Sequence, residues 1–248
     1  TSDQYAGAIA NEIEDPRIIS EIIRQWSTFH PEFSYLPRKF KIAVTGHTND
    51  RAAIKLHDIG IVIVRNEAGE TGYEVHVGGG QGRTPFVAKR LAEFVPKDKL
   101  LAYLEAVMRV YNMLGRRDKT YKARIKILVH ETGEEDMRKM VDAEFAKIDA
   151  SKMLEVPEAE IERIARYFEP PAFDTLPAQS SSFDAAQAED ENFAHWCRTN
   201  VVAHKIDGYA IVNISLKPIG GVPGDATDVQ MEAIADLAEN CSFDELRV

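Results

Sequence analysis

Three cations lie within four residues of the stretch Leu36–Val44: Arg38, Lys39 and Lys41. In an extended strand the side chains alternate between the two faces, so Lys39 and Lys41 would point to the same side. Pro37 cannot lie inside a central strand, so we expect the strand to begin directly after it. Two interpretations remain open: the lysines protect a solvated edge strand from aggregation, or they form a site for one small anion.

A glycine-rich loop is a second candidate for anion binding. Its glycines would let backbone amides approach a ligand, and we expect Pro85 to begin a helix whose free N–H groups attract phosphate or carboxylate. No Gly-Lys-Ser/Thr follows, so the loop is not a Walker A motif. The alternative is a flexible connection without a ligand. The residues concerned are Gly78, Gly79, Gly80, Gly82 and Arg83.

The segment from Arg116 to Lys126 carries six cations. Such a segment is most often a solvated helix face. The functional interpretation is a clamp for a ligand with several carboxylates, because arginine pairs with carboxylate in a bidentate manner. The arginines of this segment are Arg116, Arg117 and Arg124.

Other combinations of reactive residues have little support. His57 and Asp58 are neighbours before a β-forming run and would face opposite sides of a strand, which disfavours a hydrogen-bonded catalytic dyad. Cys197 and Cys241 are far apart and have no metal-ligand spacing, and the histidines show none either. The sequence therefore predicts no metal ligand within this chain.

The elements that would position these residues follow an α+β pattern. Asp15 and Pro16 predict the start of an amphipathic helix that ends near His30. The β-forming runs 60–65 and 72–77 predict a hairpin. Residues 98–114 predict a longer helix. The first 150 residues are thus expected to form a mixed α/β layer.

The rest of the chain changes character. Residues 151–191 predict one short helix near 157–167 and then a linker rich in proline, serine and acidic residues. Residues 192–248 predict strands over 196–204 and 209–216, a helix over 227–238 and a last strand from Phe243. This order is that of a ββαβ unit.

Composition excludes several classes of function. The 248 residues carry a net charge of -10, which argues against nucleic-acid binding as the main activity. No apolar run has the length of a membrane span, and no signal peptide is apparent. Two unpaired cysteines are typical of reduced thiols, so we expect a cytoplasmic protein without a membrane or nucleic-acid partner.

Four stretches together resemble the sirohaem-dependent nitrite and sulfite reductases. They occur in the family's order and approximate spacing, and Leu-Pro-Arg-Lys-Phe-Lys is the most specific of them. Resemblance covers the chain to about Ile148, and the part from Asn192 is similar to the start of the family's ferredoxin-like second repeat. The stretches are Leu36–Lys41, His57–Gly60, Gly78–Pro85 and Arg116–Lys126.

The resemblance implies a function for the three stretches that carry cations, here called the basic segments: Leu36–Lys41, Gly78–Pro85 and Arg116–Lys126. In that family a sirohaem is bridged to a [4Fe-4S] cluster through a shared cysteine, and sulfite or nitrite undergoes a six-electron reduction. Lys39 and Lys41 would bind the anion and aid proton delivery. The electron donor would be ferredoxin or a flavoprotein reductase. The expected sirohaem contacts are Arg38, Gly78, Gly79, Gly80, Gly82, Arg83, Arg116, Arg117 and Arg124.

The resemblance also predicts what this chain lacks. The family's cluster cysteines are expected beyond Val248, and Cys197 and Cys241 do not have their spacing. We therefore expect an internal fragment that is inactive when isolated. It would comprise a partial sirohaem domain (1–150), a helix and linker (151–191) and a partial ferredoxin-like half-repeat (192–248). Two alternatives remain open: a non-redox anion- or phosphate-binding module built on Gly78–Thr84, and a structural domain without catalysis.

Overall fold

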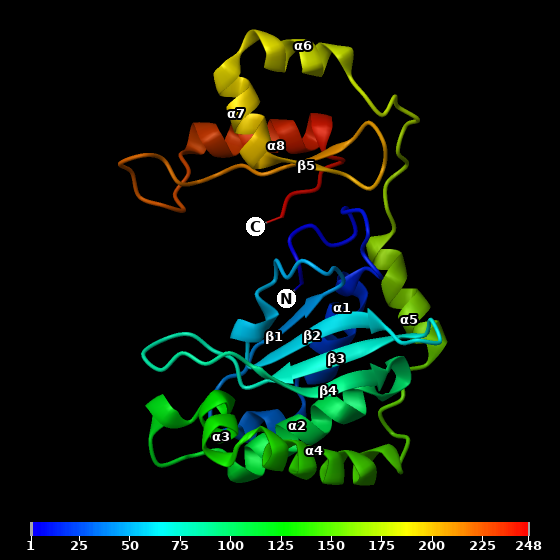
Figure 1. Ribbon diagram of the computed structural model, residues 1–248, viewed down its shortest axis with the longest axis vertical. Helices are drawn as coiled ribbons and strands as arrows, with labels where there is room; N and C mark the ends of the chain where they lie inside the picture. Colours follow the sequence, from blue (N-terminus) through cyan, green and yellow to red (C-terminus); the bar gives the residue numbers. More distant parts are fainter. Residues whose placement is uncertain (1, 248) are drawn as a thin grey trace. The chain divides into compact units, whose positions relative to one another are not determined.

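The computed structural model describes residues 2–247 and divides the chain into two compact units (Figure 1). The first unit extends to Glu169, and the second begins at Pro170. The short stretch Ala8–Ala10 belongs to the second unit. All three basic segments lie in the first unit.

A four-stranded mixed sheet is the centre of the first unit. Its order is β1-β2-β3-β4, with β1 parallel to β2 and the remaining pairs antiparallel. The hairpin expected from the two β-forming runs is confirmed as β2 and β3. The strands are β1 (Ile42–Thr45), β2 (Ile59–Arg65), β3 (Thr71–Val77) and β4 (Lys89–Pro96).

Helices complete the first unit, and α2, α3 and α4 lie together beside the sheet (Figure 1). The predicted cap of the first helix is confirmed, because the Asp15 side chain accepts a hydrogen bond from the Arg17 amide. The α-helices are α1 (Pro16–Ser27), α2 (Leu100–Leu114), α3 (Ile125–Thr132), α4 (Glu134–Asp149) and α5 (Glu158–Ala165). The short 3-10 helices are η1 (Pro31–Tyr35), η2 (Ile54–Leu56), η3 (Lys97–Lys99), η4 (Thr120–Lys122) and η5 (Arg166–Phe168).

The β-branched sequences of β2 and β3 explain the core. Residues opposite each other in an antiparallel pair share a face, so the buried residues of the two strands form one apolar surface. Helix α2 packs its own buried residues into the same core, and Leu104 is completely buried there. The strand residues on this face are Ile59, Ile61, Ile63, Tyr73, Val75 and Val77.

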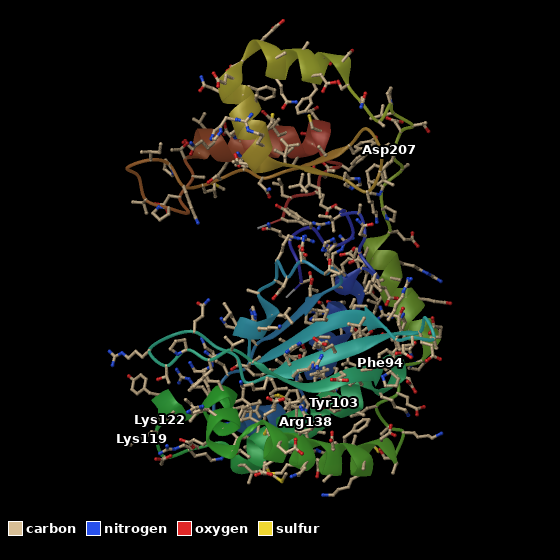
Figure 2. The ribbon with its side chains drawn as sticks, in the orientation of Figure 1. Phe94, Tyr103, Lys119, Lys122, Arg138 and Asp207 are labelled. Carbon is tan, nitrogen blue, oxygen red and sulfur yellow. The ribbon has the colours of Figure 1, made fainter. Side chains whose placement is uncertain are left out.

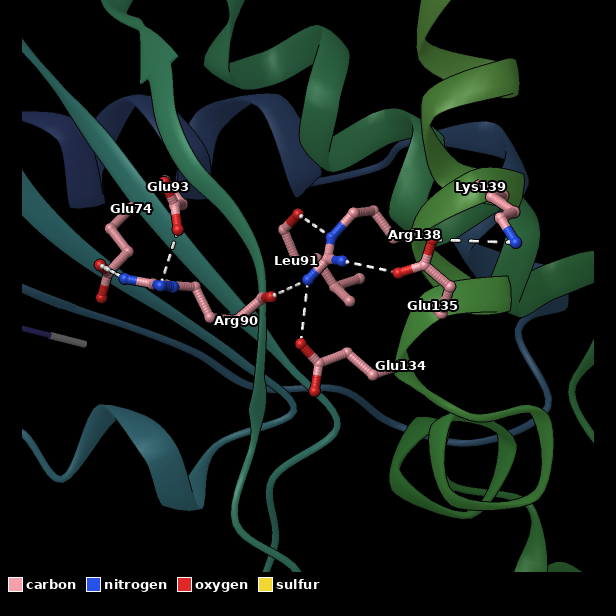
Figure 3. Close-up of polar contacts among 8 residues, drawn as sticks. All are labelled: Glu74, Arg90, Leu91, Glu93, Glu134, Glu135, Arg138 and Lys139. Carbon is pink, nitrogen blue, oxygen red and sulfur yellow. Dashed lines mark hydrogen bonds and ion pairs between the residues drawn. The ribbon is translucent and has the colours of Figure 1, made fainter.

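Arg138 of α4 holds β4 where its pairing with β3 becomes irregular. The β3–β4 register shifts near Val75, and such a bulge leaves backbone groups without a ladder partner. The Arg138 guanidinium donates hydrogen bonds to the carbonyl oxygens of Leu91 (3.0 Å) and Arg90 (2.9 Å) (Figure 3). A side chain of the helical layer thus completes the hydrogen bonding of the sheet.

The second unit contains a two-stranded antiparallel sheet and three helices. The mixed α/β fold class is confirmed, and the ββα part of the expected unit is present. In the part of the chain that the structure describes, residues 242–247 form no strand, so the expected last strand is absent there. The elements are α6 (Ser181–Glu189), α7 (Glu191–Asn200), β5 (Val201–Ala203), β6 (Ala210–Val212) and α8 (Asp228–Cys241).

Two predictions for the second unit are wrong in part, and helix caps explain both. The strand expected over 196–204 is confirmed only as β5, because its first five residues end α7, which the Asp190 side chain caps by accepting from the amides of Asn192 and Phe193. The serine-rich stretch assigned to a linker starts α6, with Ser180 as its cap. Asp and Ser favour both turns and helix starts, so composition alone did not separate the two.

We predict that Leu104→Ala lowers the free energy of unfolding by about 2–5 kcal/mol, because it leaves a cavity in the core. Met113 lies on the same helix but is 64% exposed, so Met113→Ala should change stability by no more than about 0.5 kcal/mol. Chemical denaturation of the two variants measures the difference. Equal losses would contradict the central position of α2 in the core.

Candidate functional site

The lysine stretch lies before the sheet and not within it. The segment Arg38–Lys41 has no regular secondary structure, with a bend at Arg38, and β1 begins only at Ile42. The expected strand start after Pro37 is therefore wrong, and so is the interpretation of the lysines as edge-strand residues. The Lys41 amide donates to a side chain instead of to a neighbouring strand, which explains the later start of the ladder.

The three cations of this segment are exposed to solvent. Among the described residues, no ion pair engages the ammonium groups of Lys39 and Lys41 or the guanidinium of Arg38. An open hollow lies beside Arg38 and Lys39, and Phe33, Leu36 and Phe40 complete its lining. Uncompensated cations next to an apolar surface suit an anion that is bound against a flat apolar group.

Asp58 connects the lysine segment to the other two segments. Its side chain is 1% exposed and accepts from the Lys41 amide (3.0 Å) and from Nε (3.0 Å) and a terminal nitrogen (2.7 Å) of Arg124. Its backbone carbonyl accepts from the Gly78 amide (2.8 Å). Burial raises the pKa of the Asp58 carboxyl, and its hydrogen bonds with Arg124 and Lys41 oppose that shift. One buried residue therefore joins all three basic segments, two through its carboxylate and the glycine loop through its backbone carbonyl.

Tyr111 of α2 holds the other end of the lysine segment. Its hydroxyl is 2.8 Å from the carbonyl oxygen of Ala123 and 3.1 Å from that of Arg38, and its single proton is shared between them. Burial raises the pKa of Tyr111 to about 12, so the hydroxyl remains a donor at neutral pH. Nearby, Arg117 donates to the carbonyl oxygen of Tyr35 (2.9 Å). Both ends of the segment are thus attached to the buried part of the unit.

The glycine loop lies against η2 and α3, and it does not lead into a helix. The expected helix at Pro85 is wrong: a bridge between Gly80 and Phe86 closes the loop, and β4 follows. A Cβ on Gly79 would come within 2.3 Å of the Lys55 carbonyl oxygen, so this position requires glycine. Among the described residues no helix begins at Pro85, which removes the basis of that expectation.

Lys126 fixes the loop from inside. Its ammonium is buried and donates to the carbonyl oxygens of Gln81 (2.8 Å) and Thr84 (2.6 Å). Burial lowers the pKa of Lys126, and the neighbouring Arg124 lowers it further. The Lys126 ammonium therefore stabilises the loop from its buried side, while Arg83 on the same loop is exposed to solvent.

The predicted arginine clamp has partners within the protein. Arg116 pairs with Asp118 (2.8 Å), Arg117 bonds backbone oxygens, and Arg124 bonds Asp58. Arg117 is exposed as well, but the exposed cations without an ion pair or a side-chain hydrogen bond among the described residues are Lys119 and Lys122, which lie just before α3 (Figure 2). Tyr121 between them is 97% exposed. Whether any of these residues touches sirohaem remains a prediction.

The donor set fits one of the two implied cofactors. Exposed cations on three adjoining segments suit the carboxylates of sirohaem. An iron–sulfur cluster normally requires four cysteine thiolates, but this chain has only Cys197 and Cys241, both in the second unit. Across residues 2–247, no group of three His, Cys, Asp or Glu side chains is placed to hold a metal. The cluster therefore does not fit this chain alone.

The sequence reasoning missed the residues that organise the site. The sequence signals point to Asp58 only as a neighbour of His57, and they do not single out Tyr111 within the helix predicted over 98–114. The signal for Asp58 was its place inside a stretch that resembles the family, directly before a buried strand. The signal for Tyr111 was a polar hydroxyl on an otherwise apolar face, which needs a buried partner.

Part of this chain is similar to two known reductases. A ferredoxin-dependent sulfite reductase of Mycolicibacterium paratuberculosis is 36% identical over 141 residues, which are 56% of this chain and 25% of that protein. An assimilatory ferredoxin-dependent nitrite reductase of Haloferax mediterranei is 37% identical over 150 residues, or 58% of this chain and 26% of that protein. This chain thus spans about a quarter of the length of these relatives.

A solved structure shares the fold of the first unit. The NirA protein of Mycobacterium tuberculosis matches with a TM-score of 0.53 and 31% identity, over 59% of this chain and 26% of that one. Among the described residues, no helix combines the length and hydrophobicity needed to cross a bilayer. The family model described as the nitrite and sulphite reductase 4Fe-4S domain matches residues 1–149, and the chain belongs to that family.

Proposed function

We propose that this chain is part of a sirohaem and [4Fe-4S] reductase that reduces sulfite to sulfide or nitrite to ammonia with six electrons. The observation that carries the proposal is the pair Lys39 and Lys41: two exposed cations without an ion-pair partner among the described residues, on a backbone attached to buried groups. Relatives named as sulfite and as nitrite reductases support both substrates.

The two lysines would act on the anion in two ways. Their ammonium groups would stabilise its negative charge by charge-assisted hydrogen bonds. Oxygen leaves the anion as water, which consumes protons, and a lysine next to the oxygen can supply one. Lys39 and Lys41 would therefore bind the anion and aid proton delivery.

The other exposed cations would hold sirohaem. When bound, sirohaem supplies the electrons to the sulfur or nitrogen atom of the substrate. Arg38 and Arg83 would pair with its carboxylates. The exposed Gly82 would let the macrocycle approach the loop backbone, and the buried Gly78, Gly79 and Gly80 would hold the loop in shape. Three further arginines would act mainly by fixing these segments: Arg116, Arg117 and Arg124.

The remaining expectations belong to the whole enzyme. Ferredoxin is the proposed electron donor because several relatives carry it in their names, with a flavoprotein reductase as the alternative. We propose a cytoplasmic location without a membrane or nucleic-acid partner. In domain terms, residues 1–150 would be a partial sirohaem domain, 151–191 a helix and linker, and 192–248 a partial ferredoxin-like half-repeat. A phosphate-binding module built on Gly78–Thr84 has less support, since β4 follows that loop.

We predict that Lys39→Ala and Lys41→Ala in the full-length polypeptide each lower kcat/KM for sulfite or nitrite by about 100-fold, the scale for removing one charged donor at a reacting oxygen. The sirohaem content, measured from its absorbance, should stay unchanged. Lys139→Ala is the matched control, because Lys139 is 66% exposed on α4 and makes only surface ion pairs. Loss of the sirohaem absorbance in the lysine variants would mean that they hold the cofactor instead.

We predict that the isolated chain cannot assemble a [4Fe-4S] cluster, because it offers two cysteines that do not form a ligand group. Reconstitution with iron and sulfide should give no stable cluster absorbance and no sulfite turnover, whereas the full-length polypeptide should give both. A cluster on the isolated chain that disappears in Cys197→Ser would contradict this assignment.

A further inference from the structure

We infer that Tyr111 and Asp58 are positioning residues that hold the two ends of the Arg38–Lys41 segment and so fix where Lys39 and Lys41 meet the anion. This inference rests on the proposed function for the identity of the ligand. The anchoring itself follows from contacts within the chain. Neither residue is expected to touch the substrate.

The Arg38–Lys41 segment has no regular secondary structure of its own. It lies between η1 and β1, and only its last residue, Lys41, meets the sheet, through the bond from the Ile59 amide to its carbonyl oxygen. Long lysine side chains on an unsupported backbone would sample many positions, and ordering them on binding would cost conformational entropy. A site that binds one small anion therefore needs external support for this backbone.

Buried groups support the Arg38–Lys41 backbone at both of its ends. Asp58 accepts the Lys41 amide, and the Ile59 amide donates to the Lys41 carbonyl oxygen (3.1 Å). At the other end Tyr111 reaches the Arg38 carbonyl oxygen. Both anchoring side chains are almost fully buried, with exposures of 1% and 0%. Lys39 and Phe40 lie between two fixed points.

Asp58 and Tyr111 also connect the lysine segment to the other two basic segments. Arg124 bonds Asp58, and Tyr111 bonds Ala123 directly before Arg124. The Gly78 amide bonds the Asp58 carbonyl oxygen. A shift of one segment is therefore passed to the others, so the anchors set the distance between the lysines and the glycine loop.

Two variants test the inference, each with a matched control. Tyr111→Phe removes only the anchoring hydroxyl, and its control is Tyr103→Phe on the same helix (Figure 2). Tyr103 is 3% exposed, and its hydroxyl has no hydrogen-bond partner among the described residues. Asp58→Asn removes the buried charge. Its control is Asp3→Asn, because Asp3 is 2% exposed and accepts from the Tyr5 amide and from Arg51.

The first measurement is amide hydrogen exchange in the 248-residue chain, which needs neither cofactor nor turnover. Exchange reports local opening. We therefore expect Asp58→Asn to raise the exchange rate of the Lys41 amide by about tenfold or more relative to Asp3→Asn. Tyr111→Phe should speed exchange across residues 38–41, whereas Tyr103→Phe should not. Equal exchange in variants and controls would overturn the inference.

The second measurement is sulfite affinity of the full-length holoenzyme, followed through the sirohaem absorbance. A misplacement of about 1 Å can cost on the order of 100-fold in activity, so we expect sulfite Kd to rise at least about tenfold in both variants and in neither control. Unchanged Kd in both variants would overturn the inference. If Lys39→Ala also leaves sulfite binding intact while the exchange result holds, the proposed function fails and the anchoring stands.

Discussion

The burial of one carboxylate constrains the whole first unit. A charged Asp58 without partners would be strongly unfavourable in the interior, so the fold must deliver donors to it. It receives them from the Lys41 amide and from Arg124, which are separated from it by 17 and 66 residues along the chain. The lysine segment and the basic segment are therefore brought together by the requirement to satisfy this group. The glycine loop joins them through the Asp58 backbone carbonyl.

The cations of the basic segments fall into two groups, which differ in whether protein groups bind them. Arg116, Arg117, Arg124 and Lys126 are engaged with acidic side chains or backbone oxygens. The exposed cations of the same segments have no ion pairs among the described residues. The first group fixes the backbone, and the second keeps its charge available to a ligand. In a chain with a net charge of -10, such a local excess is informative.

Much of the first unit could be predicted from the sequence, because its signals are local. The cap at Asp15, the β2–β3 hairpin and the long apolar helix α2 follow from neighbouring residues. The segment before β1 could not be predicted in this way, since its conformation depends on a bond to Asp58. The same holds for the glycine loop: its next element is decided by the Gly80–Phe86 bridge and by packing on η2.

The site residues show the same division. Charge and spacing single out Lys39 and Lys41 in the sequence; they are exposed without ion pairs among the described residues, and their role stays a prediction. Asp58 and Tyr111 were passed over, because their importance lies in long-range hydrogen bonds that a sequence does not display. The resemblance to the family supplied the order of the segments, while the contacts between them came from the structure.

The separation between Asp58 and Arg124 also has a consequence for folding. The β2–β3 hairpin can form from residues close in sequence, but the carboxylate beside it gains its arginine only when a much later part of the chain arrives. Contacts of long sequence separation form slowly, because the intervening chain must first be ordered. During synthesis on the ribosome, the sheet would therefore precede the contacts of the lysine segment. Until Arg124 has emerged, Asp58 would remain hydrated, and the lysine segment would stay unfixed.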